Sequence, residues 1–271
     1  MNGSVRSDVA SFWDELSDVY DPEGVEFFRP IARRLVELAE IRVGSRVLDV
    51  GCGRGAVVAA AADVVGPGGH VLGIDISERM VEQTKALAQE RGLVQADAVV
   101  ADGEAPPVSA GSLDAVLSSM AIFLVPDAAA ALRGYALALC PGGRLAFSTF
   151  GTGDVWERIE KAVRSFVPDL QRRDHEHAWF ATPVGIRALV EGNGFRSVEI
   201  HDESQPVAFA SAEAWYEWTF STPFRRLWRA VPESDAVAAR AAAVAKLPPP
   251  DAEGRLILDT AVRYTRAEPV A

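Results

Sequence analysis

Three closely spaced glycines are the residues of this sequence best suited to bind a small charged ligand. Gly51, Gly53 and Gly55 directly follow an apolar run, and a run of small residues comes after them. Because glycine lacks a Cβ atom, such a turn can lie close to a ligand. A helix that begins after the turn adds unpaired N–H groups, which favour a carboxylate or phosphate. The pattern therefore predicts a strand, a ligand-binding turn and a helix.

Two acidic residues restrict the kind of ligand. Asp49 lies inside the predicted strand, where it would repel a pyrophosphate but would suit the ammonium group of an amino acid. Asp75 ends the next predicted strand, 20 residues after Gly55, and could hydrogen-bond ribose hydroxyls. The glycine spacing also differs from the G-x-G-x-x-G of dinucleotide-binding folds. Both features argue against a nicotinamide-dependent oxidoreductase, which would share the turn and the acid of the second strand.

These residues resemble the first two motifs of the class I S-adenosylmethionine-dependent methyltransferases. The segment 101–104 follows a third predicted strand, where the family places an acid against the adenine amino group. The segments 113–119 and 139–147 are similar to the fourth and fifth strands of the family. The resemblance covers residues 40–150 in the right order, and it implies S-adenosyl-L-methionine as the cofactor.

The predicted cofactor site lies at the carboxyl ends of the strands, because ligands of open α/β sheets bind at that edge. The residues assigned to it are Asp49, Gly51, Cys52, Gly53, Gly55, Asp75, Ile76, Met80, Asp102, Gly103, Glu104 and Ser118.

The alternation of strands and helices predicts an α/β fold with a doubly wound, mostly parallel sheet. The resemblance implies seven strands, a Rossmann-like methyltransferase fold. We expect a helical N-terminal flap at 1–42, a cofactor-binding core at 43–150, and completion of the sheet at 151–271. A helical insertion at about 207–250, before a last strand at 256–265, is expected to form a substrate cap.

Aromatic residues are concentrated in the predicted cap region, since five of the six tryptophans come after residue 150. Small-molecule pockets are mostly apolar and aromatic, with a few placed polar groups. The alternative is that these rings pack the cap onto the sheet. The residues assigned to the substrate are Tyr20, Trp179, Trp215, Phe220 and Arg225.

Ionisable side chains of the same region are candidates for catalysis and for anion binding. His175, Glu176 and His177 could supply a general base, although a solvated polar loop is the alternative. A metal site is not expected, because alternate side chains meet only on a strand. Arg225 and its neighbours Arg226 and Arg229 could clamp a carboxylate or diphosphate, or could form a surface face paired with acids.

The composition limits the partners. The chain of 271 residues has a net charge of −11, which disfavours nucleic acid and anionic membranes. Two cysteines and the lack of a basic, apolar leader predict a cytoplasmic protein without a disulfide framework. We also consider a homodimer.

The function predicted is methyl transfer from S-adenosylmethionine to a small, largely apolar acceptor, by in-line SN2 displacement at oxygen, carbon or nitrogen. The motifs resemble quinone-ring and natural-product enzymes. One alternative is C-methylation of an isoprenoid diphosphate, with arginines, alone or together with Mg²⁺, on the diphosphate and Glu176 as the base. Others are a non-catalytic protein that binds the cofactor and an NAD-dependent oxidoreductase.

Overall fold

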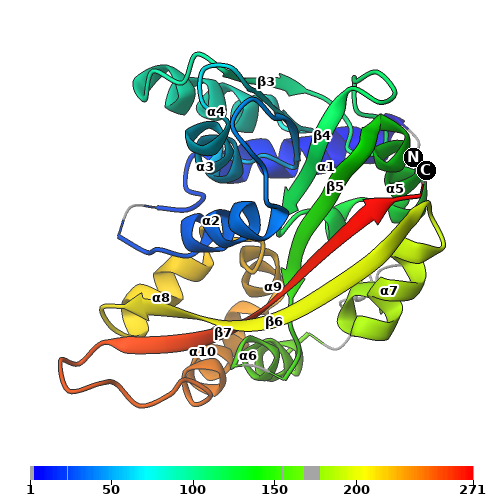
Figure 1. The fold of residues 1–271 in the computed structure, drawn as a ribbon. Helices are drawn as coiled ribbons and strands as arrows, with labels where there is room; N and C mark the ends of the chain where they lie inside the picture. The colour runs from blue at the N-terminus through cyan, green and yellow to red at the C-terminus, as the bar shows by residue number, and fades with distance from the viewer. Residues whose placement is uncertain (1–2, 23, 154, 168–177, 271) are drawn as a thin grey trace.

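The computed structural model describes residues 3–22, 24–153, 155–167 and 178–270. Its strands form one seven-stranded sheet in the order β3-β2-β1-β4-β5-β7-β6 (Figure 1). The first five strands are parallel, whereas β7 is antiparallel to both of its neighbours. The predicted doubly wound sheet is therefore confirmed. The strands are β1 (Arg46–Val50), β2 (His70–Asp75), β3 (Ala96–Val100), β4 (Leu113–Ser119), β5 (Leu139–Phe150), β6 (Phe195–Phe209) and β7 (Leu256–Pro269).

Helices cover both faces of the sheet and enclose a core on each side. One core lies under α2 and α3 and continues into the helices around β6 and β7, and the other lies under α5 and α7. The α-helices are α1 (Gly3–Ser17), α2 (Phe28–Ala39), α3 (Ala56–Val65), α4 (Glu78–Glu90), α5 (Ala128–Ala138), α6 (Val155–Arg164), α7 (Pro183–Glu191), α8 (Ala212–Thr219), α9 (Arg225–Ala230) and α10 (Ala236–Val244). Short 3₁₀ helices are η1 (Ile122–Leu124), η2 (Ala178–Ala181) and η3 (Glu233–Asp235). None of the helices in the described ranges is long and apolar enough to cross a membrane.

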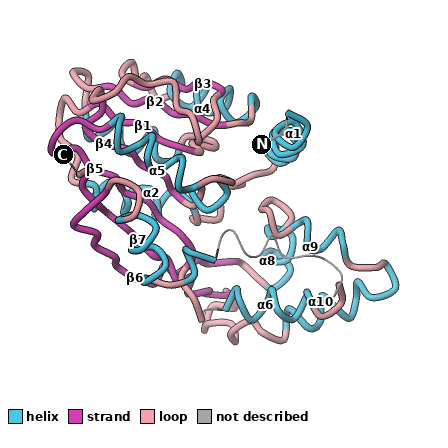
Figure 2. The backbone as a smooth tube through the Cα atoms, turned by 90° about the vertical axis from the view of Figure 1, so that its right-hand side faces the viewer, coloured by secondary structure: helices cyan, strands magenta, loops and turns pink. Residues whose placement is uncertain are grey.

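The strands β6 and β7 form a hairpin that extends beyond the rest of the sheet. β7 pairs with β5 only over residues 262–267, whereas its pairing with β6 runs from Leu256 to Pro269. The alternating pattern of residues 195–201 predicts a strand there, and because of this pairing the observed strand β6 is longer and continues to Phe209. Figure 2 shows α6, α8, α9 and α10 gathered as a lobe around the outer end of this hairpin. The insertion between the last two strands consists of α8, α9, η3 and α10, and its first helix begins at Ala212.

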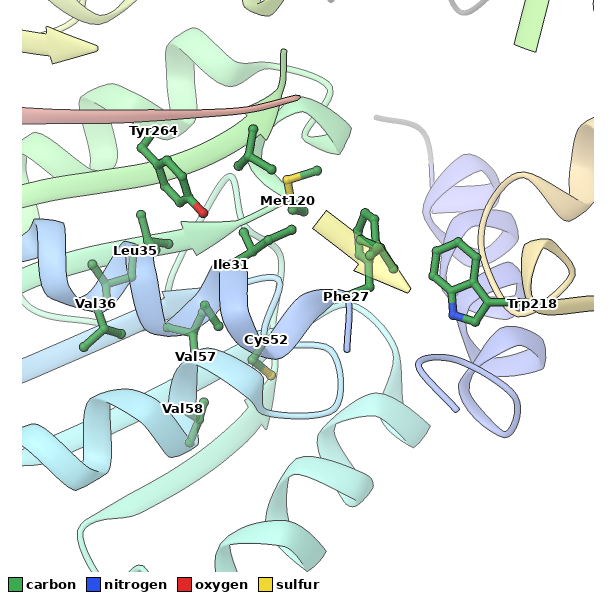
Figure 3. Packing of buried hydrophobic residues seen from close by; sticks show 14 of the residues in the cluster. Phe27, Ile31, Leu35, Val36, Cys52, Val57, Val58, Met120, Trp218 and Tyr264 are labelled. Atoms are coloured by element: carbon green, nitrogen blue, oxygen red, sulfur yellow. The ribbon is translucent and has the colours of Figure 1, made fainter. Parts of the chain in front are cut away.

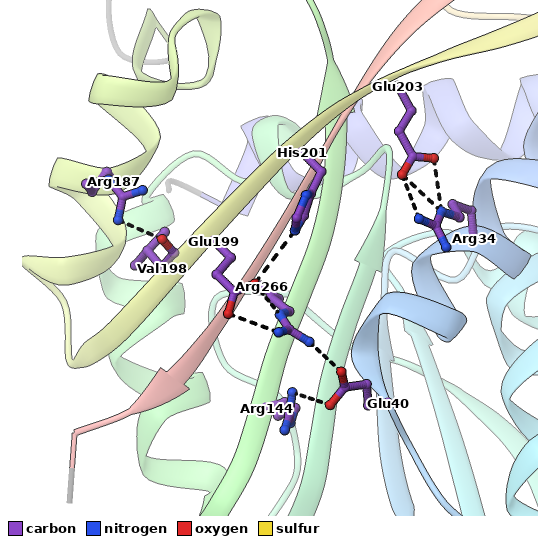
Figure 4. Close-up of polar contacts among 9 residues, drawn as sticks. All are labelled: Arg34, Glu40, Arg144, Arg187, Val198, Glu199, His201, Glu203 and Arg266. Carbon is purple, nitrogen blue, oxygen red and sulfur yellow. Dashed lines mark hydrogen bonds and ion pairs between the residues drawn. The ribbon is translucent and has the colours of Figure 1, made fainter.

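Ion pairs fasten helix α2 to this hairpin. Arg34 binds the Glu203 carboxylate through Nε at 2.9 Å and Nη2 at 2.8 Å. Arg266 lies between Glu40, which follows the last residue of α2, and Glu199 of β6, at 2.7 and 2.9 Å (Figure 4). These carboxylates hold the pKa of Arg266 above its usual value. Such exposed pairs contribute little each, but here several join elements that are far apart in the sequence.

One ion pair of the hairpin has a buried guanidinium and a half-exposed carboxylate. The side chain of Arg263 on β7 is 3% exposed and binds Asp202 of β6, with Nε–Oδ1 at 2.6 Å and Nη2–Oδ2 at 2.7 Å. Its Nη1 also donates a hydrogen bond to the Ala181 carbonyl at 3.1 Å, which connects η2 to the hairpin. Removing the guanidinium leaves a carbonyl and a carboxylate without this donor.

Replacing Arg263 with Met should therefore lower the free energy of unfolding by about 2–4 kcal/mol, measured by urea denaturation. The control is Arg196→Met on β6, because Arg196 is 62% exposed and lies 3.9 Å from Glu268. That change should stay within about 0.5 kcal/mol. Equal effects of the two substitutions would contradict a structural role for the buried guanidinium of Arg263.

Candidate functional site

The glycine turn after β1 is held by the end of β2. The N–H groups of Gly51 and Cys52 both donate to the Ile74 carbonyl, at 2.8 and 2.9 Å. Gly51, Gly53 and Gly55 have φ angles of +72°, +52° and +86°, in the left-handed region that favours glycine. A Cβ atom at Gly51 would lie 2.5 Å from the Cβ of Ala121, so the turn also passes close to the end of β4. The turn can adopt this course only with glycine.

The Asp75 carboxylate connects this turn to helix α4. Its Oδ2 accepts a hydrogen bond from the Gly53 N–H at 2.9 Å, and its Oδ1 accepts one from the Ser77 N–H at 3.0 Å. Burial raises the pKa of Asp75, and these N–H donors lower it in part. Each carboxylate oxygen has a second lone pair. Asp75 can therefore accept further hydrogen bonds, such as those of ribose hydroxyls, without releasing the turn.

Asp49 is a buried acid without a hydrogen-bonded partner. Its side chain is 1% exposed, and neither oxygen meets the geometry of a hydrogen bond within the part of the chain that the structure describes. Burial raises its pKa well above the usual 3.8, the charge of Asp75 raises it further, and the nearby backbone N–H of Val58 lowers it in part. The pKa of the Cys52 thiol is raised by the same two causes, first by burial and then by the charge of Asp75. A buried carboxylate of this kind is suited to a cationic ligand group.

The other predicted cofactor residues of β2, α4 and β4 make internal contacts. The Ser118 hydroxyl donates to the Val50 carbonyl at 2.9 Å, and Met80 and Cys52 are buried at 1% and 5% exposure. Ile76 is partly buried beside Asp75. All four side chains are therefore buried or partly buried.

The segment after β3 is fixed to helix α5. Asp102 Oδ1 accepts a hydrogen bond from the Glu104 N–H at 2.9 Å, and Glu104 Oε1 accepts one from the Asp127 N–H at 2.9 Å. The Tyr135 hydroxyl donates to the Gly103 carbonyl at 2.7 Å. Burial raises the pKa of Tyr135. The acid after β3 thus stands at the same sheet edge as Asp49 and Asp75.

Helix α1 docks over this edge through contacts that the sequence did not predict. Asp14 Oδ1 accepts hydrogen bonds from the Ser77 hydroxyl and from the Arg79 N–H, the latter at 3.2 Å. The Gln83 amide donates to the Ser17 carbonyl at 3.2 Å. Since Asp14 is 63 residues from Ser77, no local pattern could reveal this contact.

Tyr20 follows α1 and lies directly above the turn. Its Cε1 is the nearest atom to a Cβ built on Gly53, at 4.0 Å. Arg54 of the turn donates to the Tyr20 carbonyl, which anchors the backbone there. Burial, then the charges of Asp21 and Asp75, raise the pKa of Tyr20 well above 10.0. The phenol is therefore neutral and lies beside the glycine turn, and its role in ligand binding stays a prediction.

A row of aromatic rings leads from Tyr20 to the inserted helices. Tyr20 stacks on Phe28 with centroids 4.8 Å apart, and Phe28 contacts Phe27 at 4.7 Å. Phe27 in turn lies 5.3 Å from Trp218 of α8. Figure 3 shows Phe27 between Met120, at the end of β4, and Trp218. The row of Tyr20, Phe28, Phe27 and Trp218 thus forms one apolar wall that connects the glycine turn with the insertion. Of these four residues, only Tyr20 was among the predicted site residues.

The structure separates the residues assigned to the substrate. Trp215 is fully buried and packs 6.4 Å from Trp156, and Phe220 stacks on Trp228 at 6.3 Å. Trp179 instead belongs to the core on the α5 and α7 side, where it contacts Phe147 at 6.2 Å. The described contacts therefore do not bring Trp179 to the aromatic row.

Two further predictions concern polar groups of the 151–271 region. His175, Glu176 and His177 lie outside the described residues, so their role stays a prediction. Among the residues that are described, no group of three or more His, Cys, Asp or Glu side chains could hold a metal ion. Arg225 lies in the insertion near Glu15 of α1.

The arrangement places three acids, Asp49, Asp75 and Asp102, at one edge of the sheet, near the row of aromatic rings. Comparison with known proteins identifies the family to which the chain is similar. A family model described as "Methyltransferase domain" matches residues 47–143.

Two relatives match much of the chain. Nocamycin O-methyltransferase of Saccharothrix syringae is 41% identical over 249 residues, 85% of this chain and 87% of that protein. Aklanonic acid methyltransferase DauC of Streptomyces sp. (strain C5) is 45% identical over 207 residues, 72% of this chain and 94% of that protein. Neither name favours the isoprenoid diphosphate alternative.

Solved structures agree on the fold. A putative methyltransferase from Bacillus halodurans C-125 superposes with a TM-score of 0.59 at 18% identity, over 89% of this chain and 99% of that chain. The [4+2]-cyclase SpnF superposes with a TM-score of 0.61 at 18% identity, over 98% and 97% of the two chains. The fold alone thus occurs with different chemistries.

Replacing Asp49 with Asn should stabilise the ligand-free protein in a pH-dependent way. Because burial raises the pKa of Asp49 in the folded chain above 3.8, the folded state holds a proton that the unfolded chain releases. Stability from this group therefore falls as pH rises above the unfolded pKa. The free energy of unfolding of the variant should exceed that of the wild type by about 1–3 kcal/mol near pH 8.

Urea denaturation across pH measures this difference, which should shrink towards pH 4. The control is Asp97→Asn on β3, whose side chain is 58% exposed; it should change stability by less than about 0.5 kcal/mol. A pH-independent loss of stability in Asp49→Asn would show that the acid is a structural partner.

Proposed function

Because this chain belongs to the S-adenosylmethionine-dependent methyltransferases, we propose that it methylates a small, largely apolar acceptor bound between the glycine turn and the inserted helices. Relatives named for nocamycin and aklanonic acid support an acceptor of the natural-product type. The aromatic row from Tyr20 to Trp218 supports an apolar one. The 41% identity to a protein named an O-methyltransferase favours oxygen as the nucleophile.

The observation that carries the proposal is the buried Asp49 carboxylate without a hydrogen-bonded partner. S-adenosylmethionine has an ammonium group at its amino-acid end, which such a carboxylate would bind. A nicotinamide dinucleotide offers no such cation for this position. Asp75 would hold the ribose hydroxyls and Asp102 the adenine amino group, each at the carboxyl end of its strand. The residues present therefore fit this cofactor.

When bound, the cofactor supplies a methyl group on a sulfonium, which is already an excellent leaving site. The protein residues then have to position the acceptor and exclude water. Holding reacting groups at about 3 Å can supply much of the barrier reduction. Tyr20 and the docked helix α1 would cover the turn, and the rings of Phe27 and Trp218 would present an apolar surface to the acceptor. A base among His175, Glu176 and His177 remains part of the proposal for acceptors that must lose a proton.

The cellular setting is also proposed. Both described cysteines, Cys52 and Cys140, are free thiols, which supports a reducing compartment such as the cytoplasm. Assembly as a homodimer stays a prediction.

Asp49→Asn should bind S-adenosylhomocysteine, which retains the ammonium group, about 10- to 150-fold more weakly than the wild type, a loss of about 1.5–3 kcal/mol. Titration calorimetry in buffers of different ionisation heat should show proton release on binding for the wild type, because the cation lowers the pKa that burial raises. The variant should lose that release. Unchanged affinity would remove Asp49 from the cofactor site.

Gly53→Ala and Gly51→Ala form a matched pair that separates cofactor contact from folding. A Cβ at Gly53 would meet no atom of the protein closer than 4.0 Å, whereas a Cβ at Gly51 would lie 2.5 Å from Ala121. Gly53→Ala should therefore fold, at a cost of about 1–3 kcal/mol for the left-handed backbone, and should bind S-adenosylhomocysteine at least about tenfold more weakly. Gly51→Ala should lose more stability. Normal affinity in Gly53→Ala would place the ligand elsewhere.

A further inference from the structure

The guanidinium of Arg225, at the start of α9, contains a buried nitrogen that has no acceptor. Its Nη1 atom is buried and makes no hydrogen bond within the described part of the chain. Burial lowers the pKa of Arg225, and the nearby charge of Arg229 lowers it further. The side chain as a whole is half-buried, and a buried donor that lacks an acceptor is unfavourable. Such a group in a native structure calls for an explanation.

Three arginines of α9 lie close to helix α1. Glu15 of α1 is the acid whose charge acts on Arg225, but its carboxylate already lies 3.8 Å from Nη1 of Arg229. Arg226 lies over the Phe12 ring, 5.1 Å from its centroid. Three guanidiniums therefore lie near α1 with Glu15, in a chain whose net charge is −11.

Other unsatisfied donors occur in the same insertion. The indole N–H groups of Trp215 and Trp218 are buried without a hydrogen-bond partner among the described residues. The N–H groups of Trp156 and Trp228, by contrast, donate to Thr260 and Thr219 at 2.8 Å. The unpaired buried side-chain atoms of α8 and α9 are all donors, which suits a ligand rich in oxygen acceptors.

Helix α9, which carries Arg225, lies close to the elements that we propose contact the acceptor. α9 follows α8, which carries Trp218, the ring that joins the aromatic row from Tyr20. Figure 2 shows α8 and α9 within the lobe that faces α1, and Arg229 and Arg226 contact α1 residues. Arg225 thus lies in the insertion that supplies the apolar wall.

We propose that Arg225 binds a carboxylate of the acceptor and so selects acidic acceptors over neutral ones. This inference rests on the proposed methyltransferase function and names the acceptor class of its site. A guanidinium presents a planar fork that matches a carboxylate with two parallel N–H···O bonds. The aromatic row contacts the apolar remainder of the same molecule. Arg225 is a specificity-determining residue in this proposal.

The first test measures the ligand-free protein. Replacing Arg225 with Met keeps the aliphatic volume and removes the buried donor that lacks an acceptor, so the Tm should rise by about 2–4 °C. The control is Arg158→Met on α6, where the arginine is exposed, and its Tm should not change. A fall in Tm for Arg225→Met would show that Arg225 has a structural partner, and would overturn the proposal.

The second test measures selectivity with defined probes. Binding of 2-naphthoate and anthraquinone-2-carboxylate, each against its neutral carboxamide, is followed by calorimetry in the presence of S-adenosylhomocysteine. The wild type should bind each carboxylate at least about tenfold more tightly than its amide, since the charged pair adds hydrogen bonds. Arg225→Met should lose this preference, Arg225→Lys should keep part of it, and Arg158→Met should keep all of it.

The outcomes separate this inference from the function on which it rests. If S-adenosylhomocysteine binds all variants equally but the wild type does not prefer either carboxylate, or Arg225→Met keeps the preference, the role of Arg225 is refuted and the methyltransferase proposal stands. If S-adenosylhomocysteine fails to bind even the wild type, the proposed function itself fails.

Discussion

The candidate site depends on one chain of hydrogen bonds that passes through Asp75. Its carboxylate holds the Gly53 N–H of the turn and the Ser77 N–H at the start of α4. The Ser77 hydroxyl donates in turn to Asp14 of α1. One carboxylate thereby fixes the turn, orients a helix and supports the segment that covers both. Its burial makes these bonds stronger than they would be in water, so the turn is preorganised before any ligand arrives.

Two ionisable side chains of opposite type have buried atoms without a hydrogen-bond partner in the described part of the chain. Asp49 is at the glycine turn and Arg225 is in the insertion, and neither is satisfied by described residues of the chain. In a protein interior such groups reduce stability. Both are consistent with a site in which the ligands, and not the fold, complete the electrostatics. A cationic cofactor end and an acidic acceptor would neutralise them together, which gives a physical reason why the chain tolerates both.

The fold could be predicted from the sequence because its signals are local. The glycine turn, the strand that precedes it and the helix that follows all lie within about 20 residues, where period and turn chemistry decide the structure. The length of β6 could not be predicted, since pairing with β7 across the insertion extends it to Phe209. The aromatic content after residue 150 suggested one pocket, but tertiary packing sends Trp179 and Trp215 to different cores. Composition cannot assign a ring to one face of a sheet.

The insertion leaves and re-enters the sheet at Phe209 and Leu256, which are direct partners across the hairpin. Directly opposed residues of antiparallel strands are only about 5 Å apart, so the two ends of the insertion are neighbours whatever lies between them. The entropy of closing such a segment grows only slowly with its length. The helices between these two residues can therefore be replaced by others during evolution without a change in the hairpin. Such a replacement would alter the surface offered to the acceptor, while the five parallel strands would keep the cofactor edge.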